Sequence, residues 1–127
     1  MKKLLNQSIS SNKKLNFKKD KFQTLIIGVS EAKTLDGDLE VINEVSNGTI
    51  KKLISREEIT GKIGNSVYLP AISGVNAEKS YFVGTGKKNK KISEVDYFKI
   101  CQSISSAALA SKSASVKIII PEISIEN

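Results

Sequence analysis

Short apolar runs along the chain predict the strands of a β-sheet. In the longest of them, the unbroken apolar segment Leu25–Ile27 indicates a strand buried on both faces, as in a sheet covered by helices. Pro121 ends the last run, because proline cannot donate to a strand ladder. Strands are expected at Phe22–Val29, Asn65–Leu69, Tyr81–Val83 and Val116–Ile120, and a short one at Leu15–Phe17.

Helical spacing fills two of the gaps between these runs. Over residues 39–60 apolar residues recur every three or four positions, and Asn47-Gly48 interrupts the pattern, so the span is one kinked helix or two short ones. Ser93 followed by Asp96 is typical of a helix start, and a helix is expected from Glu94 to about Ser111. Its predicted inner face is Val95, Phe98, Cys101, Ile104 or Ser105, Ala108 and Leu109.

Alternating strands and helices predict an α/β fold, with a mixed β-sheet flanked by helices. We expect residues 1–21 to be a basic, loosely ordered leader with the short strand at 15–17, and residues 22–127 to form a single domain. The chain stops six residues after Pro121, where an α/β domain would enter its next helix. We therefore expect the domain to be incomplete at its C-terminus.

Composition makes catalysis by this chain alone improbable. Its 127 residues include no histidine, which is the commonest general base and zinc ligand, and one cysteine, Cys101. A metal site would depend on carboxylates, which are scattered as Asp36, Asp38, Glu40, Glu57, Glu58, Glu94 and Asp96. Glu57 and Glu58 are interpreted as solvated surface, and Cys101 as a small core residue. No apolar run approaches the roughly 20 residues that span a bilayer or forms a signal peptide, so a cytoplasmic protein without membrane contact is expected.

Positive charge is concentrated in two lysine clusters, which could bind nucleic acid. The net charge is +7, and residues 1–21 hold seven lysines against Asp20. A second cluster, KKNKK, occupies residues 87–91 and contains no aromatic residue, so any DNA would be held through its phosphates. The alternative is a solvated leader. The candidate contacts are Lys13, Lys14, Lys18, Lys19, Lys87, Lys88, Lys90 and Lys91.

Gly84-Thr85-Gly86 follows a strand and precedes two lysines, as in some phosphate-binding turns. It lacks the third glycine of a dinucleotide fingerprint and the GK[ST] ending of a triphosphate loop, and Ser93 begins the next helix six residues later. The interpretation we favour is a glycine turn at a strand exit that needs small residues. A nucleotide or ADP-ribose site remains an alternative that rests on fold analogy.

The ordering of small residues and short strands resembles a known family, the leucyl aminopeptidases, also called cytosol aminopeptidases. The resemblance is to the N-terminal domain of that family and covers roughly residues 22–123. It is carried by Leu53-Ile54, Glu58, Thr60-Gly61-Lys62, Gly64, Leu69-Pro70, Gly74, Ala77-Glu78-Lys79 and Phe82-Val83-Gly84-Thr85-Gly86-Lys87.

The resemblance implies an α/β domain similar to macro domains that carries no chemistry of its own. In the family, two divalent ions, zinc or manganese, are held by a separate C-terminal catalytic domain, whose N-T-D-A-E-G-R-L type signature is absent here. No catalytic, cofactor-binding or metal-binding residue carries over to this chain. By resemblance, the parent enzyme removes N-terminal amino acids from peptides and assembles as a hexamer, this domain serves packing and assembly, and some members also bind DNA.

Overall fold

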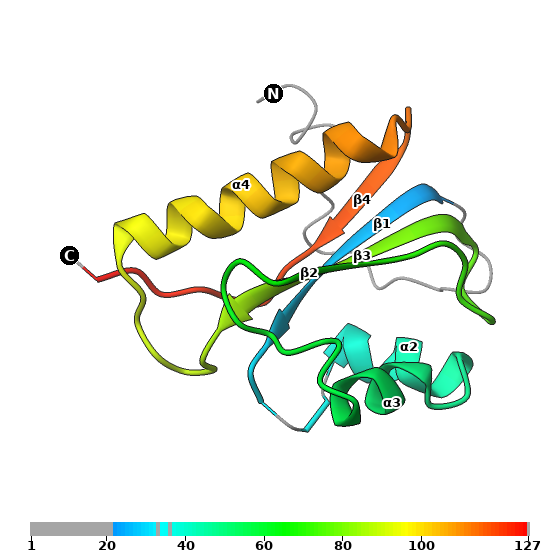
Figure 1. Ribbon diagram of the computed structural model, residues 1–127, viewed down its shortest axis with the longest axis horizontal. Coiled ribbons are helices and arrows are strands. Elements are labelled where there is room, and N and C mark those ends of the chain that lie inside the picture. Colours follow the sequence, from blue (N-terminus) through cyan, green and yellow to red (C-terminus); the bar gives the residue numbers. More distant parts are fainter. Residues whose placement is uncertain (1–21, 33, 36, 127) are drawn as a thin grey trace.

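A mixed four-stranded sheet forms the centre of the computed structural model, which describes residues 22–32, 34–35 and 37–126 (Figure 1). The predicted leader and the strand at Leu15–Phe17 lie outside these residues. Along the chain the elements are β1 (Phe22–Ser30), α2 (Gly37–Val45), α3 (Thr49–Ser55), β2 (Ser66–Leu69), β3 (Ala77–Gly86), α4 (Glu94–Ser111) and β4 (Val116–Ile119).

The strand order is β2-β3-β1-β4, so β1, the first strand in the sequence, lies inside the sheet. β1 runs parallel to both β3 and β4, whereas β2 pairs antiparallel with β3. This confirms the mixed sheet that the sequence predicts. β3 is longer than its apolar segment Tyr81–Val83 indicated, because the polar residues before it continue the pairing with β1 back to Ala77.

Helices cover both faces of the sheet (Figure 1). Alternate residues of β1 point to opposite sides, so that Leu25, Ile27 and Val29 pack with α2 and α3, while Ile26 packs with α4. The continuous apolar run of β1 is thereby buried on both faces, as predicted. The result is a three-layer arrangement of helices, sheet and helix.

Residues 39–60 form two short helices rather than one kinked helix. The chain turns between them at Asn47 and Gly48, both with positive φ angles, of 58° and 81°. The turn is tied locally, because the side chain of Asn43 accepts a hydrogen bond of 2.9 Å from the Lys51 backbone N–H. Ile42 from α2 and Ile50 from α3 are fully buried against the sheet.

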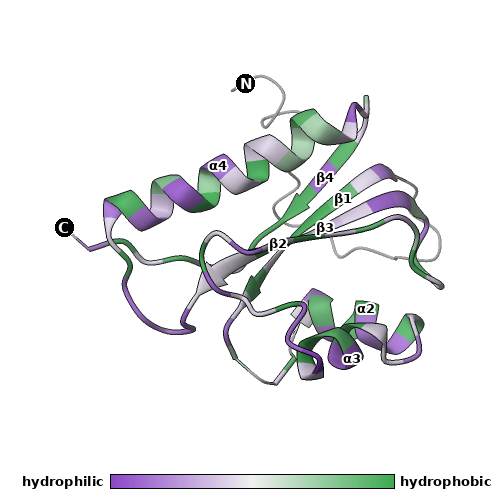
Figure 2. Cartoon of the chain, in the orientation of Figure 1, coloured by the Kyte–Doolittle hydropathy of each residue, from purple (hydrophilic) through white to green (hydrophobic). Residues whose placement is uncertain are grey.

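The start of α4 is confirmed, but its predicted inner face is only partly right: Ile104 and Ala108 are buried as predicted, and the other predicted residues are not. The Ser93 side chain caps the helix by accepting a hydrogen bond of 3.1 Å from the Asp96 N–H. Val95, Phe98 and Leu109 are 65%, 63% and 61% exposed, and Cys101 is only half-buried. Figure 2 shows apolar and polar segments alternating along much of the visible length of α4. The face against the sheet consists of smaller or β-branched residues: Ile100, Ile104, Ala107, Ala108 and Ser111.

Gly84-Thr85-Gly86 is also placed differently from its prediction as a turn. The three residues are the end of β3, and the turn follows at residues 87–89. A side chain on Gly84 would collide with the Lys62 backbone carbonyl, so the close approach of the segment before β2 requires glycine here. The glycine at position 84 is therefore required for packing, which agrees with the interpretation that small residues are needed here. The strand itself continues to Gly86, beyond its predicted end at Val83.

Candidate functional site

The ends of three parallel strands border a crevice at one edge of the sheet. The carboxyl ends of β1, β3 and β4 lie at one edge of the sheet. Beyond this edge the chain leaves β1 toward α2 on one face and leaves β3 toward α4 on the other (Figure 1). In open α/β sheets such diverging connections leave a crevice in which ligands bind. Here the crevice, which we call the carboxyl-edge crevice, is about 760 Å³ in volume.

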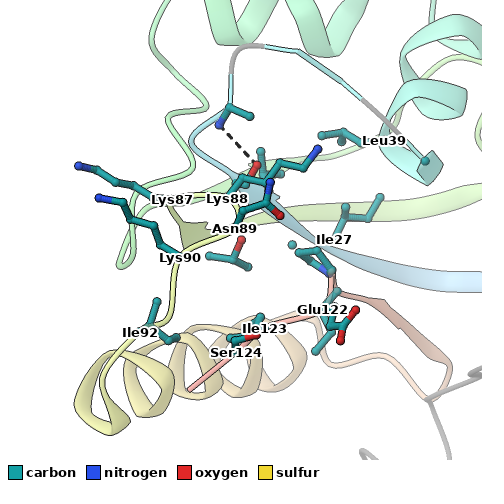
Figure 3. A pocket seen from close by; sticks show the side chains of 18 of the residues that line it. Ile27, Leu39, Lys87, Lys88, Asn89, Lys90, Ile92, Glu122, Ile123 and Ser124 are labelled. Carbon is teal, nitrogen blue, oxygen red and sulfur yellow. Dashed lines mark hydrogen bonds between the residues drawn. The ribbon is translucent and has the colours of Figure 1, made fainter. Parts of the chain in front are cut away.

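Four lysines and two carboxylates line the carboxyl-edge crevice above an apolar floor. Lys87, Lys88, Lys90 and Lys91 come from the loop after β3, Asp38 from the start of α2 and Glu122 from the segment after β4. Figure 3 shows Lys88 and Asn89 extending across the hollow, whereas Lys87 and Lys90 lie side by side and point outward from its mouth. The floor is made of Ile27, Val29, Leu39, Ile92, Ile119, Ile120 and Ile123.

Backbone hydrogen bonds hold the walls of this crevice. The N–H of Glu31 donates to the carbonyl of Gly86 at 2.9 Å, which ties the exit of β1 to the end of β3. On the other side, Ile92 donates to the carbonyl of Ser124 at 2.9 Å, and Glu126 donates to Ile92 at 2.8 Å. The loop after β3 and the segment after β4 are therefore joined although they are distant in sequence.

The glycines that end β3 do not form a phosphate cradle. The N–H of Gly84 donates to Asn65 at 2.9 Å, and the N–H of Gly86 donates to Gly61 at 2.8 Å. Both groups are thus engaged with the segment that leads into β2. Of the three residues, only Thr85 lines the crevice. The N–H groups of Gly84 and Gly86 are therefore not available to an anion at this edge.

The structure places half of the predicted nucleic-acid contacts. Lys87, Lys88, Lys90 and Lys91 are all exposed and lie together on the crevice, and the positive φ of 61° at Asn89 reverses the chain in their midst. Lys13, Lys14, Lys18 and Lys19 lie outside the described residues. DNA binding by these lysines stays a prediction.

The acidic side of the crevice escaped the sequence analysis. Asp38 appeared there only among scattered carboxylates, and Glu122 not at all, because the position of β4 beside β1 is not visible in the sequence. The signal that could have indicated Glu122 is its place just after a strand, since residues that follow parallel strands gather at one edge.

The residues present do not fit the metal centre that the family resemblance implies for the parent enzyme. Within residues 22–32, 34–35 and 37–126, no three histidine, cysteine or acidic residues come together as a metal-binding group. Glu57 and Glu58 are exposed, as predicted for solvated surface. Cys101 lies beside Tyr97 on α4, and the charge of its thiolate form, a side-chain hydrogen bond and burial together raise the pKa of the Tyr97 phenol.

A second surface, on the side of α4 that faces away from the sheet, carries three exposed apolar residues. Val95, Phe98 and Leu109 lie on it with Gln102 between them, spaced so that they share one side of the helix. We call this surface the outer α4 face. An open groove of about 890 Å³ runs beside it, with Phe98, Gln102 and Leu109 on one wall and Tyr81 and Ser66 of the sheet on the other.

Comparison with known proteins identifies relatives of this chain. Residues 26–127 match the family described as the cytosol aminopeptidase family, N-terminal domain. A probable cytosol aminopeptidase from Burkholderia thailandensis is 35% identical over 69 residues, and one from Burkholderia mallei is 33% identical over the same length. Each match covers 54% of this chain but only 14% of the relative, so the chain corresponds to a small part of these proteins.

The fold of the chain has a counterpart among solved structures. It resembles a mutant of tomato leucine aminopeptidase with a TM-score of 0.63 and 21% sequence identity, over 89% of this chain and 23% of that one. The likeness shows a shared fold and confirms the α/β architecture. Within the part of the chain that the structure describes, no helix has the length and apolar character needed to cross a membrane.

Proposed function

Since the chain belongs to the cytosol aminopeptidase family, as its N-terminal domain over residues 26–127, we propose that it is the non-catalytic part of a metal-dependent aminopeptidase. The parent enzyme would remove N-terminal amino acids from peptides in the cytoplasm. Its chemistry would be carried by a separate C-terminal catalytic domain with two divalent ions, zinc or manganese. The role of this domain would be to pack against that catalytic domain and to support assembly of a homo-oligomer, a hexamer by family resemblance.

The observation that carries this proposal is the outer α4 face. Isolated apolar residues are common on protein surfaces, but three large ones on one side of a helix next to an apolar groove favour contact with another protein surface. Burying three side chains that are now more than 60% exposed would contribute roughly 1–2 kcal/mol each. A covalently joined partner needs no more, because its effective concentration is already high.

Titration of the chain with a separately purified cytosol aminopeptidase catalytic domain tests the packing role. We expect binding, and we expect it to weaken at least ~10-fold when Val95, Phe98 and Leu109 are all changed to serine, because these residues would be the anchors of the contact. The matched control changes three exposed apolar residues elsewhere to serine, at Val41, Tyr68 and Ile120. It should bind within about twofold of the unaltered chain.

Two results would contradict the proposal. If the unaltered chain fails to bind the catalytic domain, or if the control substitutions weaken binding as much as those on the outer α4 face, this face is not the contact surface. The non-catalytic role has its own test, in which the pure chain is supplied with zinc or manganese and leucine release from leucinamide is measured. We expect none, and sustained release would overturn the role.

A further inference from the structure

We propose that the carboxyl-edge crevice binds a small phosphate-bearing molecule of about nucleotide size. The proposal concerns a surface different from the outer α4 face and does not depend on the packing role. It rests on where the crevice lies, how large it is and which charges surround it.

Position and size both suit a small ligand. The crevice lies at the carboxyl ends of three parallel strands, where the connections after β1 and β3 depart to opposite faces of the sheet. Its volume of about 760 Å³ falls within the range of small-molecule sites. The start of α2, the loop after β3 and the segment after β4 all contribute to its walls, so the hollow is bounded by three segments.

The charge distribution around the crevice favours a ligand with negative charge. Among the described residues that line the hollow, Lys87, Lys88, Lys90 and Lys91 outnumber the two carboxylates. Lys87 and Lys90 lie at the mouth of the crevice and point outward (Figure 3), so their charge makes the entrance positive and would attract a phosphate-bearing molecule toward it. Lysine ammonium groups bind phosphate as mobile point charges, so affinity should fall as salt rises.

The floor of the crevice argues for more than a bare phosphate. Leu39, Ile120 and Ile123 line the hollow, and because Ile120 is 44% exposed and the other two are half-buried, they offer an apolar surface to the remainder of a ligand. The part of the lining that the structure describes includes no aromatic ring, so a base would rest there on aliphatic side chains rather than stack. A walled hollow with a cationic rim and an apolar floor fits a nucleoside phosphate better than duplex DNA, which needs an open surface that follows its backbone.

Calorimetric titration of the full chain with adenosine diphosphate, inorganic pyrophosphate, adenosine and a short DNA duplex tests the inference. One variant changes Lys87, Lys88, Lys90 and Lys91 to glutamine. The matched control changes Lys51, Lys52, Lys62 and Lys99 to glutamine, which removes the same charge from exposed sites outside the crevice. We expect one molecule of the diphosphate to bind, at least ~10-fold more weakly to the crevice variant and within about twofold to the control.

Two further variants sharpen the test. Glu122→Gln removes a carboxylate from the crevice and should strengthen diphosphate binding about two- to threefold. Ser124→Trp places a bulky side chain at an exposed position of the lining and should block the diphosphate while leaving every lysine in place. Circular dichroism of each variant verifies that the fold is retained.

The inference is overturned by any of three results. These are no binding of either diphosphate or pyrophosphate at millimolar concentration, equal weakening by the crevice and control variants, and a preference for the DNA duplex that Ser124→Trp leaves unchanged. Tighter binding of pyrophosphate than of adenosine diphosphate would also count against it, because the apolar floor would then have no role.

Discussion

The two helical layers of this domain use their apolar residues in different ways. On one side of the sheet, α2 and α3 are short, and their main apolar residues, Ile42 and Ile50, are fully buried. On the other side, the 18-residue α4 buries small and β-branched residues against the sheet and leaves Val95, Phe98 and Leu109 exposed. Helices α2 and α3 thus bury their main apolar residues, whereas α4 also carries apolar residues on a side that no described part of the chain covers.

This difference changes how α4 should be understood. A surface helix normally shows one apolar stripe, and a helix that is apolar on both sides is typical of an element that lies between two packed surfaces. Substitutions of similar residues at buried and exposed positions test this difference between the two helical layers.

The largest contrast is between two phenylalanines. Phe82 packs in the core beneath α2 and α3 and is 1% exposed, so Phe82→Ala should lower the free energy of unfolding by roughly 3–5 kcal/mol. Phe98 on the outer α4 face should tolerate alanine to within about 0.5 kcal/mol. Urea denaturation of the two variants provides the measurement. Comparable losses would mean that the outer α4 face is already packed within this domain.

The cap of α4 gives a smaller effect. Ser93→Ala removes the side chain that satisfies the Asp96 N–H and should lower the free energy of unfolding by about 1 kcal/mol. Ser106 is exposed in the middle of the same helix, and there alanine should stabilise slightly because of its higher helix propensity. Thermal denaturation of this pair compares the two sites directly. A similar response in both variants would show that the cap contributes nothing.

The smallest effect should have the opposite sign. Ser80 on β3 pairs in register with Leu25, faces α2 and α3, and its buried hydroxyl has no hydrogen-bond partner. Ser80→Ala should therefore leave the free energy of unfolding unchanged or raise it by up to about 1 kcal/mol. Ser111 is equally buried on the α4 side, but its hydroxyl donates to the Ala108 carbonyl at 2.8 Å, so Ser111→Ala should destabilise. Calorimetric unfolding of both variants measures the difference, and a clear loss from Ser80→Ala would reveal a partner for its hydroxyl.

The sequence predicts most of the fold because the decisive signals are local. Phe22–Val29 is apolar enough to require cover on both faces, and Asn47-Gly48 supplies the positive φ angles that separate α2 from α3. The face of α4 that meets the sheet is not local information. Its serines and alanines fit any side of a helix, and only the close approach to the sheet selects the side with Ile100 and Ala107 over that with the bulkier Phe98.

Only one wall of the carboxyl-edge crevice could be predicted from the sequence, because the other wall depends on the order of the strands in the sheet. The lysine loop at residues 87–91 stands out in the sequence, but its opposite wall comes from residues 119–124. The two walls meet because β4 pairs with β1 at the edge of the sheet and because the N–H of Ile92 donates a hydrogen bond to the carbonyl of Ser124. Spacing and composition carry no record of that strand order.

The central place of β1 also has a consequence for how the domain is made. Thr24 pairs with Val116, so the first strand to leave the ribosome must wait for the last before both of its edges are covered. At synthesis rates of about 5–20 residues per second, that wait lasts roughly 5–20 s. During this interval the strand that contains the apolar segment Leu25–Ile27 has at most one neighbour, and pairing at such long sequence separation is slow. We expect the nascent chain to depend on chaperone protection until β4 emerges.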